Sequence, residues 1–351
     1  MAEASTRSAL RRLCATALLL AVLVAVGAQP LAAQSADTFY KGKAVTIYVY
    51  TPPSGTSYDL TAHLLARYLP AHLPGQPSVM VKNMPGGGGL TLTRYLFAVA
   101  PKDGTAFGTI PRSMPFETLL GSEMLDFDPL KFTWLGSPAA ESSVALAWHT
   151  APVKTAQDLL EKELMVGGTG ASADSELIPK ALNGLVGTRF KVIPGYAGVA
   201  MSSNAMERGE TEGMAYWSWS AVKAAKGDWL REKKVNILFQ TGRAPHPDLP
   251  DVPLAMAFAK TDRQQQALQL LLARDALAFP YVAPPDLPPA RAAILKKAFL
   301  DGFNDPGLIE DARKATFQVG PVSAAQAEAI IRQAFATPPE VIEDVRKALG
   351  R

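Results

Sequence analysis

The sequence predicts an α/β fold, because strand-like and helix-like segments alternate along most of the chain. Apolar runs such as 44–50 and 77–84 have the length and the Val, Ile and Tyr content of strands. The segment 59–69 between them has helical periodicity, with Leu60, Leu64 and Tyr68 on one face. Strands that alternate with helices favour largely parallel sheets with helices on both faces.

The same alternation continues beyond these first elements to about residue 245. Further strands are predicted at 106–110, 132–137, 144–150, 164–170, 189–196, 212–219 and 235–242. Further helices are predicted at 90–100, 115–121, 155–163, 176–187 and 205–210. From about 262 the chain is mostly helical, with a proline-rich connector at 283–289.

The N-terminus has the features of a secretory signal peptide. Three arginines precede an uncharged apolar run at 13–28, and small residues follow it. Because this run is short for a membrane span, we expect export and cleavage near Ala33 or Ala36. A retained N-terminal anchor is the alternative.

Cysteine content and charge exclude several classes of protein. The only cysteine, Cys14, lies inside the predicted signal, so the exported chain has neither disulfides nor thiol chemistry. Removing residues 1–34 leaves 32 Lys and Arg against 31 Asp and Glu, a formal net charge of +1. That balance gives no case for a nucleic-acid partner or an anionic membrane surface. The exported chain is long enough to bury one large core or two.

Four loops at predicted strand ends have the composition of ligand-binding loops, at 51–59, 83–89, 167–175 and 194–198. In parallel sheets, ligands sit at the carboxyl ends of strands. Glycine lets the backbone approach a ligand closely, and Ser and Thr add hydroxyls. Free N–H groups at a helix N-terminus favour a carboxylate.

A purely structural role stays open for each of these loops. Loops rich in Pro and Gly are usually turns, and Ser57 or Ser175 would also serve as helix N-caps. Pro179 should lie in the first turn of its helix, which predicts a helix start near Glu176 and an open loop over 167–175.

The usual catalytic and metal-binding signatures are missing from the sequence. There is no G-x-S-x-G elbow, no G-x-x-x-x-G-K-[ST] phosphate loop and no G-x-G-x-x-G dinucleotide fingerprint. The four histidines have no metal-ligand spacing. We therefore expect no catalytic residue, no metal site and no cofactor.

An aromatic segment at 215–220 ends the strand predicted at 212–219. Alternation along that strand puts Trp217 and Trp219 on one face. This face is either part of the core or an aromatic wall that holds the organic part of a ligand.

The order and spacing of these segments resemble the tripartite tricarboxylate transporter substrate-binding proteins, the Bug family of periplasmic receptors. Besides the signal peptide, the matching motifs are FYKGKAVTIYVYTPPSGTSYDL, VKNMPGGGG, APKDGTAFGT, GGTGASADSELIPKALNGLVG and HPDLPDVPLA. They span nearly all of the exported chain, and their order is more specific than any single motif.

This resemblance implies a two-domain periplasmic-binding-protein fold of the Venus flytrap, type II-like class, each domain a mostly parallel sheet flanked by helices. After a signal peptide at 1–36, domain 1 would comprise 37–140 plus 246–351, and domain 2 would comprise 141–245. The implied function is that of a periplasmic monomer. It would capture a small organic acid in the interdomain cleft and deliver it to membrane transporter subunits.

The resemblance also implies that amides and hydroxyls hold the ligand carboxylate, since none of the four loops contains Lys or Arg. The ligand-binding residues carried over are Ser54, Gly55, Thr56, Ser57, Asp59, Gly168, Thr169, Gly170, Ser172, Gly195, Tyr196 and Gly198. Trp217 joins them from the aromatic segment. The chain departs from the family pattern at PSGTS, where paired glycines are usual, and at Met201, where a glutamate is usual. A receptor for a membrane signalling partner and a secreted α/β hydrolase or isomerase are the alternative functions.

Overall fold

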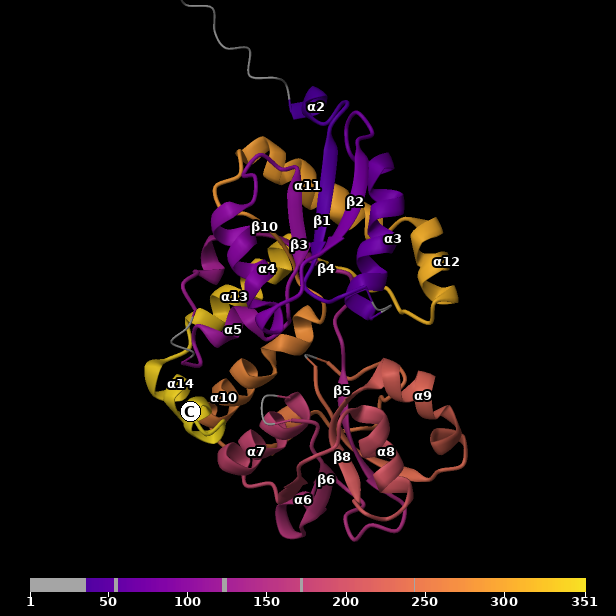
Figure 1. Ribbon diagram of the computed structural model, residues 1–351. Coiled ribbons are helices and arrows are strands. Elements are labelled where there is room, and N and C mark those ends of the chain that lie inside the picture. Colours follow the sequence, from indigo (N-terminus) through magenta and orange to yellow (C-terminus); the bar gives the residue numbers. More distant parts are fainter. Residues whose placement is uncertain (1–35, 54–55, 122–124, 171–172, 243) are drawn as a thin grey trace, which may run out of the picture.

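Two mixed β-sheets lie in separate lobes, and helices flank both of them (Figure 1). The computed structural model describes residues 36–53, 56–121, 125–170, 173–242 and 244–351. The predicted signal peptide therefore lies outside the described residues except at its end, and so do Ser54, Gly55 and Ser172. The predicted two-domain α/β fold is confirmed, but both sheets are mixed, whereas mostly parallel sheets were expected.

The first sheet has six strands in the order β11-β4-β10-β3-β1-β2. Strand β1 pairs in parallel with β2 and β3, whereas β10 runs antiparallel to β3 and β4, and β11 runs antiparallel to β4. Their bounds are β1 Ala44–Val49, β2 Ser78–Asn83, β3 Ala106–Thr109, β4 Thr133–Ser137, β10 Tyr281–Ala283 and β11 Val322–Ser323.

The second sheet has five strands in the order β7-β6-β8-β5-β9. Strand β6 is parallel to β7 and β8, whereas β5 is antiparallel to β8 and β9. Their bounds are β5 Ser143–Trp148, β6 Leu164–Gly167, β7 Phe190–Ile193, β8 Gly213–Ser218 and β9 Val235–Gln240.

The helices cover both faces of the sheets, as alternating strands and helices require. The helices that precede β9 in the chain are α2 Ala36–Phe39, α3 Ser57–His72, α4 Leu90–Arg94, α5 Met114–Glu117, α6 Asp158–Glu161, α7 Asp174–Val186, α8 Val199–Glu207 and α9 Trp219–Arg231. The later ones are α10 Asp262–Leu272, a 3₁₀ turn Ala273–Leu277, α11 Pro289–Phe303, α12 Pro306–Lys314, α13 Ala324–Phe335 and α14 Pro339–Ala348.

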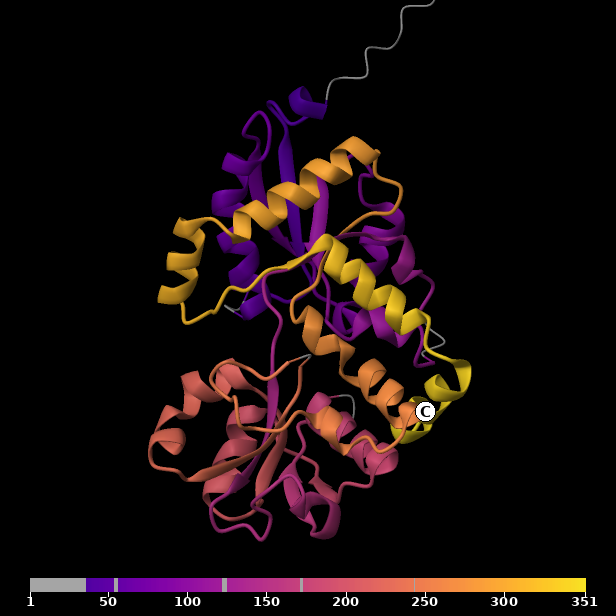
Figure 2. The same ribbon diagram turned by 180° about the vertical axis from the view of Figure 1, so that it is seen from behind.

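The chain passes between the lobes where the strands change sheet. It leaves the first sheet after β4 and enters the second at β5, and it leaves the second after β9. Two helices of the C-terminal segment nevertheless reach the second lobe, because α10 and α14 pack beside α7 (Figure 2). There the Gln264 side chain donates to the Leu185 carbonyl at 3.0 Å. The exact domain boundaries stay predictions.

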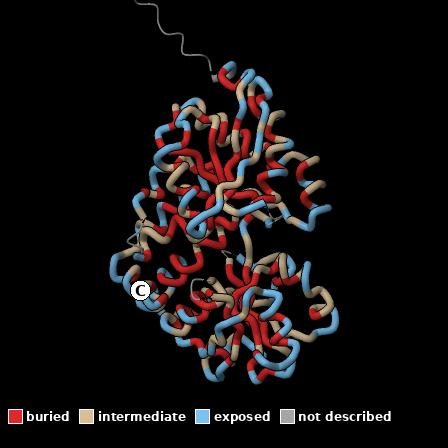
Figure 3. Tube along the Cα trace, viewed as in Figure 1, coloured by how far each residue is buried: buried red, intermediate tan, exposed pale blue. Residues whose placement is uncertain are grey.

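The buried residues follow the strands and the inner faces of the helices in both lobes (Figure 3). In the first lobe, Tyr281 packs against Phe299 and Phe303, with ring centroids 5.2 and 6.2 Å apart. In the second, Trp229 packs edge-on against Trp148 and Trp217. Each sheet therefore has apolar side chains packed against its helices, which fixes the strand ends from which the site is built.

Two element boundaries differ from the sequence-based expectation. Helix α7 begins at Asp174 and not near Glu176, so Pro179 lies at its sixth position. The proline leaves only the Ser175 carbonyl without a helical donor, which the start of a helix tolerates better than its middle. Strand β8 ends at Ser218, and Trp219 is the first residue of α9. The expected strand alternation of Trp217 and Trp219 is therefore wrong.

Candidate ligand-binding site

A cavity of about 750 Å³ lies between the lobes, at the carboxyl ends of β1, β3 and β8. The first lobe contributes the start of α3, the segment Pro111–Ser113 after β3 and residues 315–320. The second lobe contributes Asp174 and the start of α9. The volume falls in the range of small-molecule sites, about 300–1,000 Å³. Ligands bind in this position in open α/β sheets.

The N-terminus of α3 borders the cavity through Ser57. Thr56 is the N-cap, and its hydroxyl accepts a hydrogen bond from the Asp59 N–H at 3.4 Å. The Asp59 carboxylate is buried and accepts from the Asn83 side chain at 2.8 Å. Of the predicted first-loop residues that the structure describes, only Ser57 therefore lines the cavity. Its place at the positive end of a 16-residue helix suits an anion.

Aromatic rings form the wall next to Ser57. Tyr58 stacks edge-on against Tyr50 and Phe279, with centroids 4.7 and 5.0 Å apart. Its hydroxyl donates to the Ala278 carbonyl at 3.0 Å and accepts from the Arg112 N–H at 3.3 Å. Burial raises the pKa of Tyr58, so the phenol is neutral. The wall therefore offers apolar ring surface without charge.

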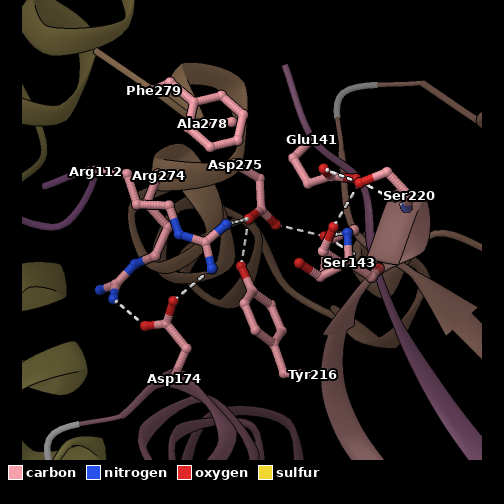
Figure 4. Close-up of polar contacts among 12 residues, drawn as sticks. Arg112, Glu141, Ser143, Asp174, Tyr216, Ser220, Arg274, Asp275, Ala278 and Phe279 are labelled. Carbon is pink, nitrogen blue, oxygen red and sulfur yellow. Dashed lines mark hydrogen bonds and ion pairs between the residues drawn. The ribbon is translucent and has the colours of Figure 1, made fainter. Parts of the chain in front are cut away.

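A cluster of four charged side chains joins the lobes at the edge of the cavity (Figure 4). Arg112, from the first lobe, donates to Asp174 at the start of α7 at 2.6 Å. It also donates to Asp275, in the 3₁₀ turn after α10, at 3.2 Å. Arg274 donates to the second oxygen of Asp174 at 2.8 Å. Two guanidinium groups and two carboxylates thus balance one another.

Asp275 is the buried centre of this cluster, with no exposed side-chain surface. Figure 4 shows its carboxylate between the Arg112 guanidinium and the Tyr216 hydroxyl, which donates to it at 2.5 Å. The Thr241 hydroxyl donates to its other oxygen. Burial raises the pKa of Asp275 despite the opposing charge of Arg112. Asp174 differs: burial raises its pKa, but Arg274 and Arg112 outweigh burial and hold that pKa below its usual value.

Two further charged side chains line the cavity from the second lobe. Lys223 donates to Asp248 at 2.5 Å. Glu141, on the crossing that precedes β5, accepts from the Ser220 hydroxyl at 2.8 Å (Figure 4). Ser220 is the second residue of α9, so Glu141 lies at the positive end of that helix.

Backbone N–H groups of the predicted third loop donate to side chains at the start of α7. The Thr169 N–H donates to the Ser175 hydroxyl at 3.1 Å, and the Gly170 N–H donates to Glu176 at 3.0 Å. Gly168 packs so closely on Glu176 that a Cβ there would lie 2.5 Å from the Glu176 Cγ. In the described part of this loop, residues 168–170 therefore contact the first turn of α7. Gly168, Thr169 and Gly170 are not among the cavity-lining residues of the described chain.

The segment after β7 joins the third loop and not the cavity. The Tyr196 N–H donates to the Gly168 carbonyl at 3.2 Å. Gly195 and Gly198 flank it, and Gly198 precedes α8. In the described part of the chain, none of these three residues lines the cavity. Their predicted role in ligand binding stays a prediction.

The two tryptophans of the aromatic segment have different positions. Trp217 is 7% exposed and packs with Trp229 and Met214 in the second-lobe core. Trp219 lines the cavity, and its indole N–H donates to Asp248 at 3.1 Å. Trp219 therefore takes the wall position that we predicted for Trp217.

The glycine run after β2 has a structural role. Gly86, Gly87, Gly88 and Gly89 all have positive φ, between 54° and 145°. At Gly89 a Cβ would collide with the ring of Pro111, which follows β3. Glycine is needed here because the chain adopts left-handed conformations and approaches Pro111 closely.

Three charged residues that line the cavity were not predicted from the sequence: Arg112, Glu141 and Lys223. Arg112 follows a correctly predicted strand, so the strand-end rule that selected the four loops would also have found it. Glu141 and Lys223 carried no comparable signal, because their places depend on the crossing between lobes and on where α9 begins. Among the described residues, no group of three His, Cys, Asp or Glu could hold a metal ion. No helix in the described part of the chain is long and apolar enough to cross a membrane.

Several solved structures are similar to this chain in fold, among them a solute-binding protein and a periplasmic binding protein. A TctC solute-binding protein from Polaromonas has a TM-score of 0.68 at 16% identity, covering 87% of this chain and 99% of its own. The periplasmic binding protein BugD has a TM-score of 0.58 at 20% identity, covering 88% and 98%. MatC from Rhodopseudomonas palustris, solved with bound malate, has a TM-score of 0.56 at 19% identity, covering 88% and 99%.

The chain has structural matches but no match at the level of sequence. No protein-family model matches the chain. No curated protein matches it either. At identities of 16–20% the structural likeness establishes the fold, and the expected resemblance is confirmed at that level. The chain therefore has the two-domain fold of the periplasmic binding proteins of the TctC and Bug type.

Proposed function

We propose that this protein is a periplasmic solute-binding protein that captures a small organic acid between its two lobes. The observation that carries the proposal is the cavity of about 750 Å³ whose walls come from both lobes. A ligand held there contacts both lobes at once, so its binding energy favours the closed arrangement over the open one. The malate bound by MatC supports the choice of an organic acid.

The ligand carboxylate would bind at the start of α3. Ser57, the first residue of α3, lines the cavity, so its N–H and hydroxyl are the groups that would bind the carboxylate, and the helix macrodipole favours negative charge there. Tyr58, Phe279 and Trp219 supply ring surface for the rest of the ligand. We still propose that amide and hydroxyl groups bind the acid, but we now assign them to the start of α3 and not to four loops.

Delivery to a tripartite tricarboxylate-type membrane transporter is the second part of the proposal. The fold likeness to TctC and Bug proteins supports it, because closing the lobes on a ligand changes the surface that a membrane partner contacts. We propose that the protein binds as a monomer in the periplasm and catalyses no reaction. Arg112, which lines the cavity, is bound to Asp174 and Asp275 in ion pairs, and these groups are therefore engaged in structure.

A thermal-shift screen of the exported chain tests the proposal. The panel holds monocarboxylates, dicarboxylates, tricarboxylates and aromatic acids. A ligand at 100 times its Kd stabilises the folded state by about 2.7 kcal/mol, so a true ligand raises the melting temperature by several degrees. If no acid in the panel raises it, the protein is not an organic-acid receptor.

A further inference from the structure

Glu141 is held firmly at the cavity. Its backbone N–H donates to the Asp275 carbonyl at 2.9 Å, which ties it to the charge cluster between the lobes. Its carboxylate accepts from the Ser220 hydroxyl at 2.8 Å and lies 3.5 Å from the Ser220 N–H. Both protein contacts of the carboxylate therefore come from one neutral residue.

The other charged side chains at the cavity all have partners of opposite charge. Arg112 is bound to Asp174 and Asp275, and Arg274 completes that neutral group of four. Lys223 is bound to Asp248. His246 also lines the cavity, and its ring lies 3.7 Å from the Asp248 carboxylate. Among the described residues, no cation lies within ion-pair distance of Glu141. In the part of the cavity wall that the structure describes, Glu141 is thus the one charged side chain without a counter-charge.

This charge affects one end of any bound ligand. Glu141 already uses the hydroxyl at the start of α9, so a second ligand carboxylate would find that donor occupied and a like charge beside it. A ligand group with N–H or O–H donors would instead meet a carboxylate that has accepting capacity left. Hydrogen bonds from a charged donor are stronger than those from a neutral one.

We propose that Glu141 determines the class of ligand: an acid with one carboxylate and a hydrogen-bond donor at its far end, with ammonium preferred over hydroxyl. The inference rests on the proposed function, because the single carboxylate is the group that binds at α3. Dicarboxylates, such as the malate bound by MatC, are disfavoured by this site.

Isothermal titration with matched probes tests this inference. The pairs are succinate and 4-aminobutanoate, glutarate and 5-aminopentanoate, and adipate and 6-aminohexanoate. Within each pair, the number of carbons is constant and one carboxylate is replaced by an aminomethyl group, which carries the ammonium at the position of a carboxylate oxygen. At the length that binds best, the wild-type protein should prefer the amino acid at least tenfold over the dicarboxylate. Equal binding, or tighter binding of the dicarboxylate, overturns the inference and leaves the proposed function intact.

The variant Glu141→Gln isolates the charge, because glutamine keeps an oxygen that can accept from Ser220. We expect it to reduce the preference for the amino acid at least tenfold and to bind the dicarboxylate more tightly than the wild type. A preference that is unchanged in the variant overturns the assignment to Glu141, even where the melting temperature falls. If the wild type binds none of the six probes and no acid of the wider panel, both this inference and the proposed function fail.

Discussion

The Arg112 guanidinium and the Asp174 carboxylate meet at 2.6 Å across the two lobes, one residue following β3 and the other starting α7. Each is 23% exposed in its side chain, so water screens the pair only in part. Asp275 and Arg274 complete the group from the 3₁₀ turn after α10. Three separate segments are therefore joined by charge beside the cavity.

Removing Arg112 should destabilise the protein strongly. Arg112→Ala leaves Asp275 buried with its main cation missing, and breaking a buried pair in this way costs about 3–5 kcal/mol. Arg67→Ala is the control, because its 2.7 Å pair with Asp311 is on the surface, where such pairs contribute about 0–1 kcal/mol. Urea unfolding measures both, and similar losses in the two variants would contradict the account of the cluster.

Acid should weaken the protein partly through Asp174. Its pKa is below the usual value in the folded state, so its stabilising contribution is present above the unfolded-state pKa of about 3.9 and is lost as pH falls through the folded-state pKa. Asp174→Asn removes this contribution. The difference in unfolding free energy between wild type and variant should therefore narrow from pH 5 to pH 3. A difference that stays constant over this range would show that Asp174 is not the titrating group.

The start of α3 can be tested with two substitutions at one position. Ser57→Pro removes the N–H at the first helical position, which proline tolerates, and the extended backbone of Thr56 suits a following proline. Ser57→Ala removes the hydroxyl and keeps the N–H. Hydrogen bonds to charged groups contribute about 1.5–3 kcal/mol, so Ser57→Pro should weaken acid binding by at least tenfold and more than Ser57→Ala does. Normal binding by the proline variant in isothermal titration would move the carboxylate away from this helix.

Export can be tested on the protein recovered from the producing cell. We expect a mature N-terminus after Ala33 or Ala36, because the apolar run at 13–28 is followed by small residues. Intact-mass spectrometry gives the answer directly. A chain that still begins before Leu13 would rule out cleavage at these positions.

Most elements up to about residue 245 were predicted because they depend on local sequence pattern, whereas the short strands β10 and β11 of the first sheet were not predicted. The strands at 44–49 and 143–148 lie within or next to the runs expected from their apolar content. Strand ends were harder: Trp219 has the residue type of a strand, and only the tertiary contact of its N–H with the Ser142 carbonyl places it at a helix start.

The candidate site was predictable in position but not in composition. The rule that ligands bind at the carboxyl ends of strands pointed to the start of α3, and Ser57 does line the cavity. The same reasoning selected Gly168, which packs against Glu176, and Gly170, whose N–H donates to the Glu176 carboxylate six positions further along. Glu141 could not be predicted from the sequence, because its place in the site depends on its contact with Ser220, 79 residues away in the chain.

Blocking the cavity tests the central claim most directly. Ala224 and Ala225 are exposed neighbours on α9, and only Ala224 lines the cavity. Isothermal titration with the acid that gives the largest thermal shift should show binding by Ala225→Trp that equals the wild type and binding by Ala224→Trp that is at least tenfold weaker, with both variants folded. If Ala224→Trp binds as tightly as Ala225→Trp, the acid does not bind between the lobes.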